Sequence, residues 1–265
     1  MKNKVFILST GRSGTNYLTK KIDALNLVTN NLHQGNMSRR INILSNIALK
    51  HPKINSLLVN KLQRNPEMLN NFIDPLKSLA FFYYLKDLKQ NSPESFKDVT
   101  IIHLVRDPRD FVRSFMNWKD RKLSGKIAHN LVPYWMPKPK NNFLKNLNMS
   151  KFEHYCWTWE IKNELFHNTF HDIDNYILVR FEDMINNEDV LLRILNKVSG
   201  VEISKIQLSK NDTTKVNSTK NKSFPDWKEW NNKQSQLLHS ICGEQMELYQ
   251  YGLEDEWQEK LKNEK

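Results

Sequence analysis

The residues best suited to chemistry stand in one short loop near the N-terminus. It contains two glycines, Gly11 and Gly14, one cation, Arg12, and two hydroxyl side chains, Ser13 and Thr15. Glycine lets a backbone turn tightly, and the N–H groups and dipole at the start of a helix bind anions. An apolar run precedes this loop and a helical pattern follows it, so the sequence predicts a phosphate or sulfate site between a strand and a helix. An ordinary glycine turn is the alternative.

The spacing within this loop differs from that of the loop that binds ATP in P-loop kinases. The kinase motif reads G-x-x-x-x-G-K-[ST], with a lysine directly after its second glycine. Here Thr15 follows Gly14, and the cation Arg12 lies two residues before that glycine. This difference in spacing counts against ATP as the ligand of the loop. An ATP-dependent small-molecule kinase that also binds magnesium stays open as an alternative.

A second candidate group follows the apolar run at residues 99–105. Arg106 and Ser114 stand eight residues apart there. An arginine offers a planar fork to a phosphate, and a hydroxyl about two turns into the next helix can reach back to the same pocket. For this motif alone, an ion pair of the arginine with Asp107 or Asp110 is the alternative. Two such motifs in this order, each after a predicted strand, are much harder to obtain by chance than either motif alone.

The two motifs resemble those of sulfotransferases that use 3′-phosphoadenosine-5′-phosphosulfate (PAPS). Residues 9–18 look like the family's 5′-phosphosulfate loop in its Arg-Ser-Gly-Thr form. Arg106 and Ser114 resemble the arginine and serine with which the family binds the donor's 3′-phosphate. Residues 176–184 are similar to a later strand that commonly ends in R-Y-E-D-L. Residues 217–227 are similar to a basic loop that closes over the 3′-phosphate. The resemblance therefore covers most of the chain.

The resemblance assigns roles residue by residue. It implies donor binding by Gly11, Arg12, Ser13, Gly14, Thr15, Asn16, Arg106, Ser114, Lys220 and Lys222. It also implies that 3′-phosphoadenosine 5′-phosphate (PAP) is the product and that no metal is required. Phe181 replaces the tyrosine of R-Y-E-D-L, so any hydroxyl contact from that position is lost.

Sulfuryl transfer resembles phosphoryl transfer, because an oxygen attacks in line while charge moves onto the leaving phosphate. Arg12 is the leading residue to stabilise that charge. The acceptor hydroxyl also needs a general base. His33 lies where some bacterial sulfotransferases carry a His-Glu segment, but Gln34 replaces the glutamate. Asp74, which precedes the second motif, is the competing candidate, and for both the alternative is an exposed polar residue of a loop. His103 stands in an apolar strand and is expected to be a core histidine.

Composition limits the class of protein and its partners. The chain has 265 residues, a formal net charge of +11 and two cysteines, Cys156 and Cys242, which are expected to be buried thiols. The scattered lysines show no nucleic-acid-binding motif, so the excess charge favours small or polymeric anions, solubility, or peripheral contact with an anionic membrane. No apolar run is long enough for a membrane span or a signal peptide, which predicts a cytoplasmic protein. Likeness to bacterial relatives suggests a carbohydrate or glycolipid acceptor. A nucleotide-binding or polyanion-binding module without activity is the non-enzymatic alternative.

Strand and helix patterns alternate along the chain, which predicts an α/β fold. The expected strands are 4–8, 99–105 and 176–179, and the expected helices are 16–25, 39–49, 54–62, 76–88, 110–118, 152–170, 182–198 and 233–249. They form a three-layer sandwich with a central parallel sheet flanked by helices, of the P-loop-like sulfotransferase type. One domain is expected over residues 1–265, with excursions at 36–90 and 119–170 that shape the acceptor site.

Overall fold

The chain folds into two compact units, each built from two separate stretches of sequence. The computed structural model describes residues 4–25, 38–49, 51–65, 69, 73–117, 149–205 and 223–262. The first unit comprises Met1–Val105 and Leu165–Asn217, and the second comprises Arg106–Glu164 and Ser218–Lys265. The expectation of one domain over the whole chain stays a prediction.

A sheet of three parallel strands forms the centre of the first unit. Its strands are β1 (Lys4–Ser9), β2 (Val99–Val105) and β3 (Tyr176–Arg180), with β2 in the middle. Every residue of β2 is buried, as is typical of a parallel strand covered on both faces. Ser9 pairs with Leu104 in the register of β1 against β2. These two strands therefore end side by side at one edge of the sheet.

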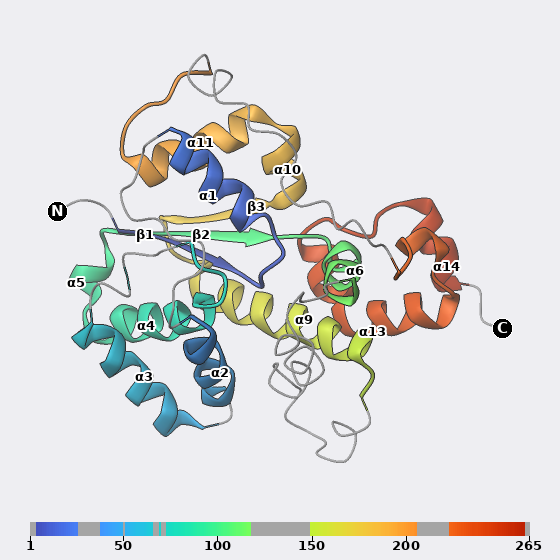
Figure 1. Ribbon diagram of the computed structural model, residues 1–265, viewed down its shortest axis with the longest axis horizontal. Helices are drawn as coiled ribbons and strands as arrows, with labels where there is room; N and C mark the ends of the chain where they lie inside the picture. Colours follow the sequence, from blue (N-terminus) through green and yellow to red (C-terminus); the bar gives the residue numbers. More distant parts are fainter. Residues whose placement is uncertain are drawn as a thin grey trace. The chain divides into compact units, whose positions relative to one another are not determined.

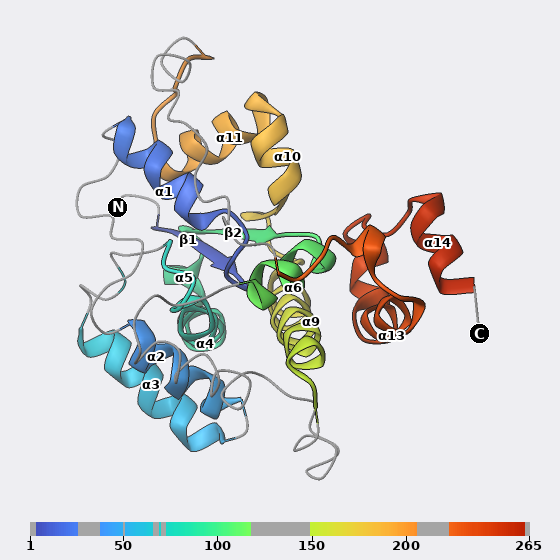
Figure 2. The same cartoon turned by 45° about the vertical axis from the view of Figure 1, so that its right-hand side comes forward.

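Helices cover both faces of this sheet. They are α1 (Thr15–Ala24), α2 (Ser38–Ala48), α3 (Pro52–Arg64), α4 (Ser78–Asn91), α5 (Pro93–Phe96), α10 (Phe181–Asn186) and α11 (Glu188–Ser199). Figure 1 shows α1, α10 and α11 on one face and α4 on the other. In Figure 2, α2 and α3 lie side by side and pack with α4. The predicted α/β fold with a central parallel sheet flanked by helices is confirmed.

The alternation of side chains along β1 explains why both faces are covered. Phe6 and Leu8 belong to the apolar cluster that contains α4, whereas Val5 and Ile7 belong to the cluster that contains α1 and α11. Successive side chains of a strand point to opposite faces. A strand with apolar side chains on both faces therefore needs a helix on each side.

The second unit is helical in its described residues. It contains α6 (Pro108–Met116), η2 (Trp227–Glu229), α13 (Asn232–Leu248), α14 (Asp255–Lys262) and α9 (Lys151–Phe170) up to Glu164. The ring of Trp159 on α9 meets that of Tyr249 edge-on at 6.0 Å. Cys156 and Cys242 are buried and free, and the thiol of Cys242 lies 3.5 Å from the carbonyl oxygen of Cys156. The prediction of two buried thiols is confirmed.

Most predicted elements are present, and the differences have local causes. The helix expected over 182–198 is divided at Asn187, whose side chain accepts a hydrogen bond from the N–H of Asp189 and begins α11. The helix expected from residue 110 begins at Pro108, because the Asp107 side chain caps it through the Arg109 N–H. Asparagine and aspartate favour such positions. The sequence patterns also missed the short helices α5 and α14. Among the described helices, none combines the length and the apolar character needed to cross a bilayer.

His103 is a core histidine, as predicted. It is fully buried in β2, and its Nδ1 shares a hydrogen bond of 2.6 Å with the hydroxyl of Tyr176. That hydroxyl also lies 3.4 Å from Nδ1 of His167, whose ring stacks on His171 at 4.9 Å. Burial lowers the pKa of His167, and the neighbouring His171 lowers it further. The folded protein therefore favours the neutral form of His167.

This environment predicts a loss of stability at acid pH. The pKa of His167 is lower in the folded state than in the unfolded chain, so its stabilising effect is complete above about pH 6.5 and is lost as the pH falls below that. Urea unfolding should give a lower free energy of unfolding at pH 5.5 than at pH 7.5. The part due to His167 should stay below about 1 kcal/mol, because the ring is partly exposed. A His167→Asn variant should show a weaker pH dependence, and an unchanged dependence would contradict this assignment.

Candidate functional site

The loop after β1 has an unusual backbone. Gly11 has a φ of 84°, Arg12 a φ of 56° and Gly14 a φ of 84°. Glycine adopts this left-handed region at little cost, but a side chain such as that of Arg12 is disfavoured there by about 1 kcal/mol. Residues held in such conformations cluster at functional sites. The loop therefore places its arginine in a specific and costly conformation.

Hydrogen bonds hold this loop in its fold. The N–H of Ser9 donates to the Ser78 hydroxyl at 3.1 Å, and the N–H of Gly11 donates to the Ser9 hydroxyl at 3.2 Å. The Ser13 hydroxyl donates to the carbonyl of Gly11 at 3.0 Å and lies 3.3 Å from the hydroxyl of Thr10. The Ser13 side chain is fully buried. Its hydroxyl thus has an internal partner within the loop.

The loop opens directly into α1. Gly14 is the N-cap residue of this helix and has no side chain to cap it, and the first turn contains no acidic residue. Thr15 is buried and begins the helix, and Asn16 follows it half-buried. The partial positive charge of a helix start attracts anions. The start of α1 is therefore suited to a phosphate or a sulfate.

Phe181 packs against this helix start. A Cβ atom built on Gly14 would lie 2.3 Å from the Phe181 ring and 3.1 Å from Cε of Met184. This close approach requires a glycine at position 14 independently of its φ angle. The aromatic ring that replaces the family's tyrosine thus lies beside the loop.

Asp74 lies in a turn next to the same loop. A Cβ atom on Gly11 would meet that of Pro75 at 3.9 Å. Asp74 itself is fully buried, not exposed. One of its carboxylate oxygens accepts the Leu76 N–H at 3.0 Å, and the other accepts the Ser38 hydroxyl. The structure thus brings the turn of Asp74 and the loop together within the first unit.

Lys77 is a buried cation beside the turn of Asp74. It is 5% exposed and directly precedes Ser78, the residue that binds the Ser9 N–H. Burial lowers the pKa of Lys77, and the charge of Asp74 partly offsets this shift. No motif marks this lysine in the sequence, because its burial depends on the tertiary fold.

Arg106 and Ser114 belong to the second unit. Arg106 directly follows β2, and its carbonyl accepts the indole N–H of Trp159 at 2.8 Å. Its guanidinium lies 3.6 Å from the carboxylate of Asp110, which is the ion pair that the sequence analysis considered. Ser114 lies two turns into α6 and is half-buried. Burial raises the pKa of Asp110, and the charge of Arg106 lowers it in part.

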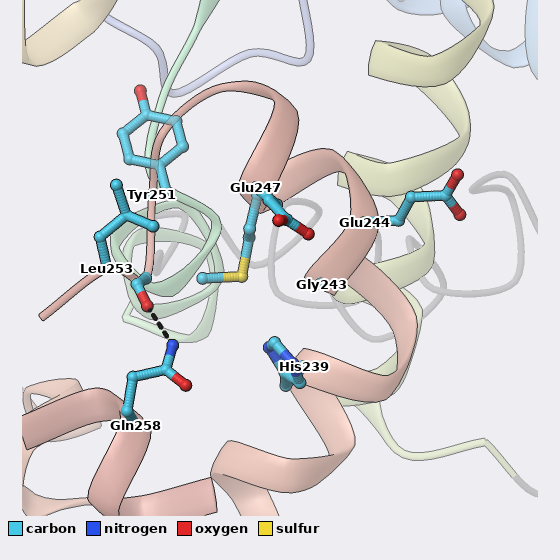
Figure 3. Close-up of a pocket in the computed structure, with 9 residues that line it drawn as sticks. His239, Gly243, Glu244, Glu247, Tyr251, Leu253 and Gln258 are labelled. Atoms are coloured by element: carbon cyan, nitrogen blue, oxygen red, sulfur yellow. Dashed lines mark hydrogen bonds between the residues drawn. The ribbon is translucent and has the colours of Figure 1, made fainter. Parts of the chain in front are cut away.

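A pocket of about 390 Å³ lies elsewhere in the second unit. Figure 3 shows it, with His239, Glu247 and Gln258 among its lining residues. It contains none of the residues predicted for the site, and its carboxylates would repel a polyanionic donor. Within the described parts of the chain, no group of His, Cys, Asp or Glu side chains is arranged to hold a metal ion.

Three predicted site residues lie outside the described residues. They are His33, Lys220 and Lys222. The described candidates fall into two groups, which are the loop with the turn of Asp74 in the first unit and Arg106 with Ser114 in the second.

Comparison with known proteins places nearly the whole chain in one family model. A model described as a sulfotransferase domain matches residues 2–264. A search of curated proteins and a search of solved structures each found no match. The match extends over both predicted motifs.

The contact with Phe181 predicts a large effect of an added methyl group at position 14. Gly14→Ala should lower the free energy of unfolding by about 2 kcal/mol or more, because it combines backbone strain with a steric clash. Gly200→Ala is the matched control, because Gly200 has a φ of 70° but nothing within 4 Å of an added Cβ. The free energy of unfolding of this control should fall by only about 1 kcal/mol. Equal losses in urea unfolding would show that the Phe181 contact is unimportant.

Proposed function

We propose that this chain, which belongs to the sulfotransferase domain family, transfers a sulfuryl group from PAPS to an acceptor hydroxyl. The observation that carries the proposal is the loop from Gly11 to Gly14, whose left-handed backbone leads into the start of α1. A phosphosulfate has two anionic groups that such a loop can bind. Family membership favours sulfuryl over phosphoryl transfer. The ATP-dependent kinase is therefore the weaker alternative.

The loop is proposed to bind the 5′-phosphosulfate of the donor. Its backbone N–H groups and the residues Ser13, Thr15 and Asn16 would hold the group at the start of α1. Arg12 would neutralise the charge that develops on the departing phosphate. A preorganised cation lowers the barrier most when charge appears in the transition state. The costly φ of Arg12 supports such a role.

Arg106 and Ser114 are proposed to bind the 3′-phosphate of the same donor, with help from Lys220 and Lys222. Two observations support a shared ligand. The strands β1 and β2 are parallel neighbours that end at one edge of the sheet, and each predicted motif directly follows one of them in the chain. Ligands of open α/β sheets bind at the carboxyl ends of their strands.

The proposed reaction is an in-line displacement at sulfur. The acceptor oxygen forms a bond to sulfur while the bond from sulfur to the bridging phosphate oxygen breaks. PAP leaves with the electron pair of that bond, and the acceptor proton passes to a general base. No step in this scheme uses a metal ion.

His33 is proposed as the base, with Asp74 as its alternative. Both carboxylate oxygens of Asp74 already accept hydrogen bonds, from Leu76 and Ser38. These two hydrogen bonds support a structural role for Asp74, which is to hold the turn beside the loop. A turnover rate that survives His33→Ala would transfer the role of base to Asp74.

The acceptor is proposed to be a carbohydrate or glycolipid hydroxyl, and the protein is proposed to act in the cytoplasm. The acceptor class rests on likeness to bacterial relatives alone. Two free and buried thiols support a reducing compartment. A screen of sugar acceptors for sulfate transfer tests the acceptor class, and transfer only to phenols or steroids would contradict it.

Replacing Arg106 tests the assignment of the 3′-phosphate. Arg106→Ala should weaken PAP binding by about 2 kcal/mol, or roughly thirtyfold, because it removes a charge-assisted contact. Adenosine 5′-monophosphate has no 3′-phosphate, so its affinity should stay the same. Arg193→Ala removes an exposed arginine from α11 and serves as the control. Calorimetric titration measures all three proteins, and an unchanged PAP affinity in Arg106→Ala would remove this residue from the site.

The strained conformation of Arg12 gives a second test, which separates stability from turnover. Arg12→Gly removes both the guanidinium and the strain of a positive φ, so the free energy of unfolding should hold or rise slightly. The turnover rate should fall by about 100-fold or more, as expected when a group that stabilises transition-state charge is lost. Arg12→Lys keeps the charge but not the planar guanidinium, so its turnover rate should fall less than that of Arg12→Gly. A glycine variant with normal turnover would contradict the proposed role.

A further inference from the structure

The helix α6, which begins two residues after Arg106 and contains Ser114, has a second polar face. Arg109, Arg113 and Asn117 follow one another at intervals of four residues, so they form one stripe along α6. This stripe, residues 109, 113 and 117, lies next to a second stripe formed by residues 110 and 114. The proposed reaction uses Arg106 and Ser114 but leaves Arg109, Arg113 and Asn117 without a role.

The side chain of Asn117 binds the backbone of a distant part of the chain. Its side-chain oxygen accepts the N–H of Phe224 at 2.7 Å, and its side-chain nitrogen donates to the carbonyl of Phe224 at 2.9 Å. The Ser223 hydroxyl donates to the same oxygen at 3.3 Å. Asn117 is 3% exposed. One buried amide thus fixes the segment 223–230 to the last turn of α6.

Arg113 links the two stripes by charge. It forms an ion pair of 2.6 Å with Asp226 of the segment 223–230 and lies 3.8 Å from Asp110. Asp110 in turn lies 3.6 Å from Arg106. The charges therefore alternate from Asp226 through Arg113 and Asp110 to Arg106. A movement of the segment 223–230 would change the balance of charge around the arginine proposed to bind phosphate.

Arg109 fixes the first turn of the helix. Its guanidinium pairs with Asp107 at 2.6 Å and with Glu254 at 2.7 Å, and its side chain is 1% exposed. It also faces the ring of Trp227 at 4.3 Å and that of Trp257 at 5.0 Å. Burial alone would lower the pKa of Arg109, but the hydrogen bonds that its guanidinium donates to Asp107 and Glu254 raise it, so the side chain stays charged.

Ion pairs of this kind can fix a geometry without adding much stability. A buried ion pair contributes little net free energy, because removing charges from water costs about as much as their attraction returns. A network of this kind does fix one geometry among several of similar energy. Here the fixed element is the helix that begins two residues after Arg106 and contains Ser114.

We infer that Arg109, Arg113 and Asn117 are positioning residues that hold α6 against the segment 223–230 and Glu254, so that Arg106 and Ser114 keep the spacing that a 3′-phosphate requires. This inference rests on the proposed function. The residues act through Arg106 and Ser114 and do not themselves touch the donor. Binding sites lose much of their effect when such supporting residues let them shift by a fraction of an ångström.

The test compares two ligands that differ only in the 3′-phosphate. In Asn117→Ala and in Glu254→Gln, the ratio of PAP affinity to adenosine 5′-monophosphate affinity should fall by about tenfold, while the affinity for the monophosphate stays within twofold of wild type. Tyr249→Phe is the matched control. It removes a buried hydrogen bond of the second unit, from the Tyr249 hydroxyl to the carbonyl of Asn163, and keeps the aromatic ring. The ratio of PAP affinity to adenosine 5′-monophosphate affinity in Tyr249→Phe should equal that of the wild type.

Each outcome has one meaning. A role in stability alone would lower the melting temperature of the variants but leave the ratio unchanged, and this result would overturn the inference. Glu254→Gln keeps the shape of a half-exposed side chain, so it gives a folded protein if Asn117→Ala does not. If wild-type protein binds both ligands equally, the proposed 3′-phosphate site itself is wrong. The two failures are thus distinguishable.

Discussion

The parallel pairing of β1 with β2 sets where the chain leaves the sheet toward each predicted motif. The pairing sets Ser9 opposite Leu104, so the glycine loop and the chain that leads to Arg106 leave the sheet at the same edge. Apolar side chains on both faces of these strands hold the pairing in place. A shift of one residue would turn every one of those side chains to the opposite face. The hydrophobic core therefore fixes where the polar residues of the proposed site begin.

Each unit holds residues of the proposed site with a network of its own. In the first unit, Ser9, Ser13 and Ser78 bind the loop backbone, and Phe181 leaves room for no side chain at position 14. In the second unit, the buried Arg109 fixes the start of α6. Both networks support residues proposed to meet a phosphate. A site that binds anions selectively needs such preorganised groups, because side chains that must first be ordered lose affinity to conformational entropy.

The sequence predicts the strands well because each is a short, mainly apolar run, and β2 begins and ends where its pattern does. It also marks the loop, since the glycines and Arg12 form a motif with a physical reason for each residue. Other features depend on contacts between distant residues. The burial of Asp74 and Lys77, the ring of Phe181 against Gly14 and the hold of Asn117 on Phe224 leave no periodic signal in the sequence. The division of a predicted helix at Asn187 was likewise missed, because an asparagine N-cap within an apolar pattern is easily read as a helical residue.

The central claim is that the chain binds a 3′-phosphorylated adenosine nucleotide as a sulfotransferase does. Titration calorimetry of the wild-type protein with PAP, and separately with ATP and Mg²⁺, tests it most directly because it requires no knowledge of the acceptor. We expect PAP to bind in the micromolar range, corresponding to about −8 kcal/mol, and ATP to bind more weakly whether or not Mg²⁺ is present. Preference for ATP with Mg²⁺, or no binding of PAP, would contradict it.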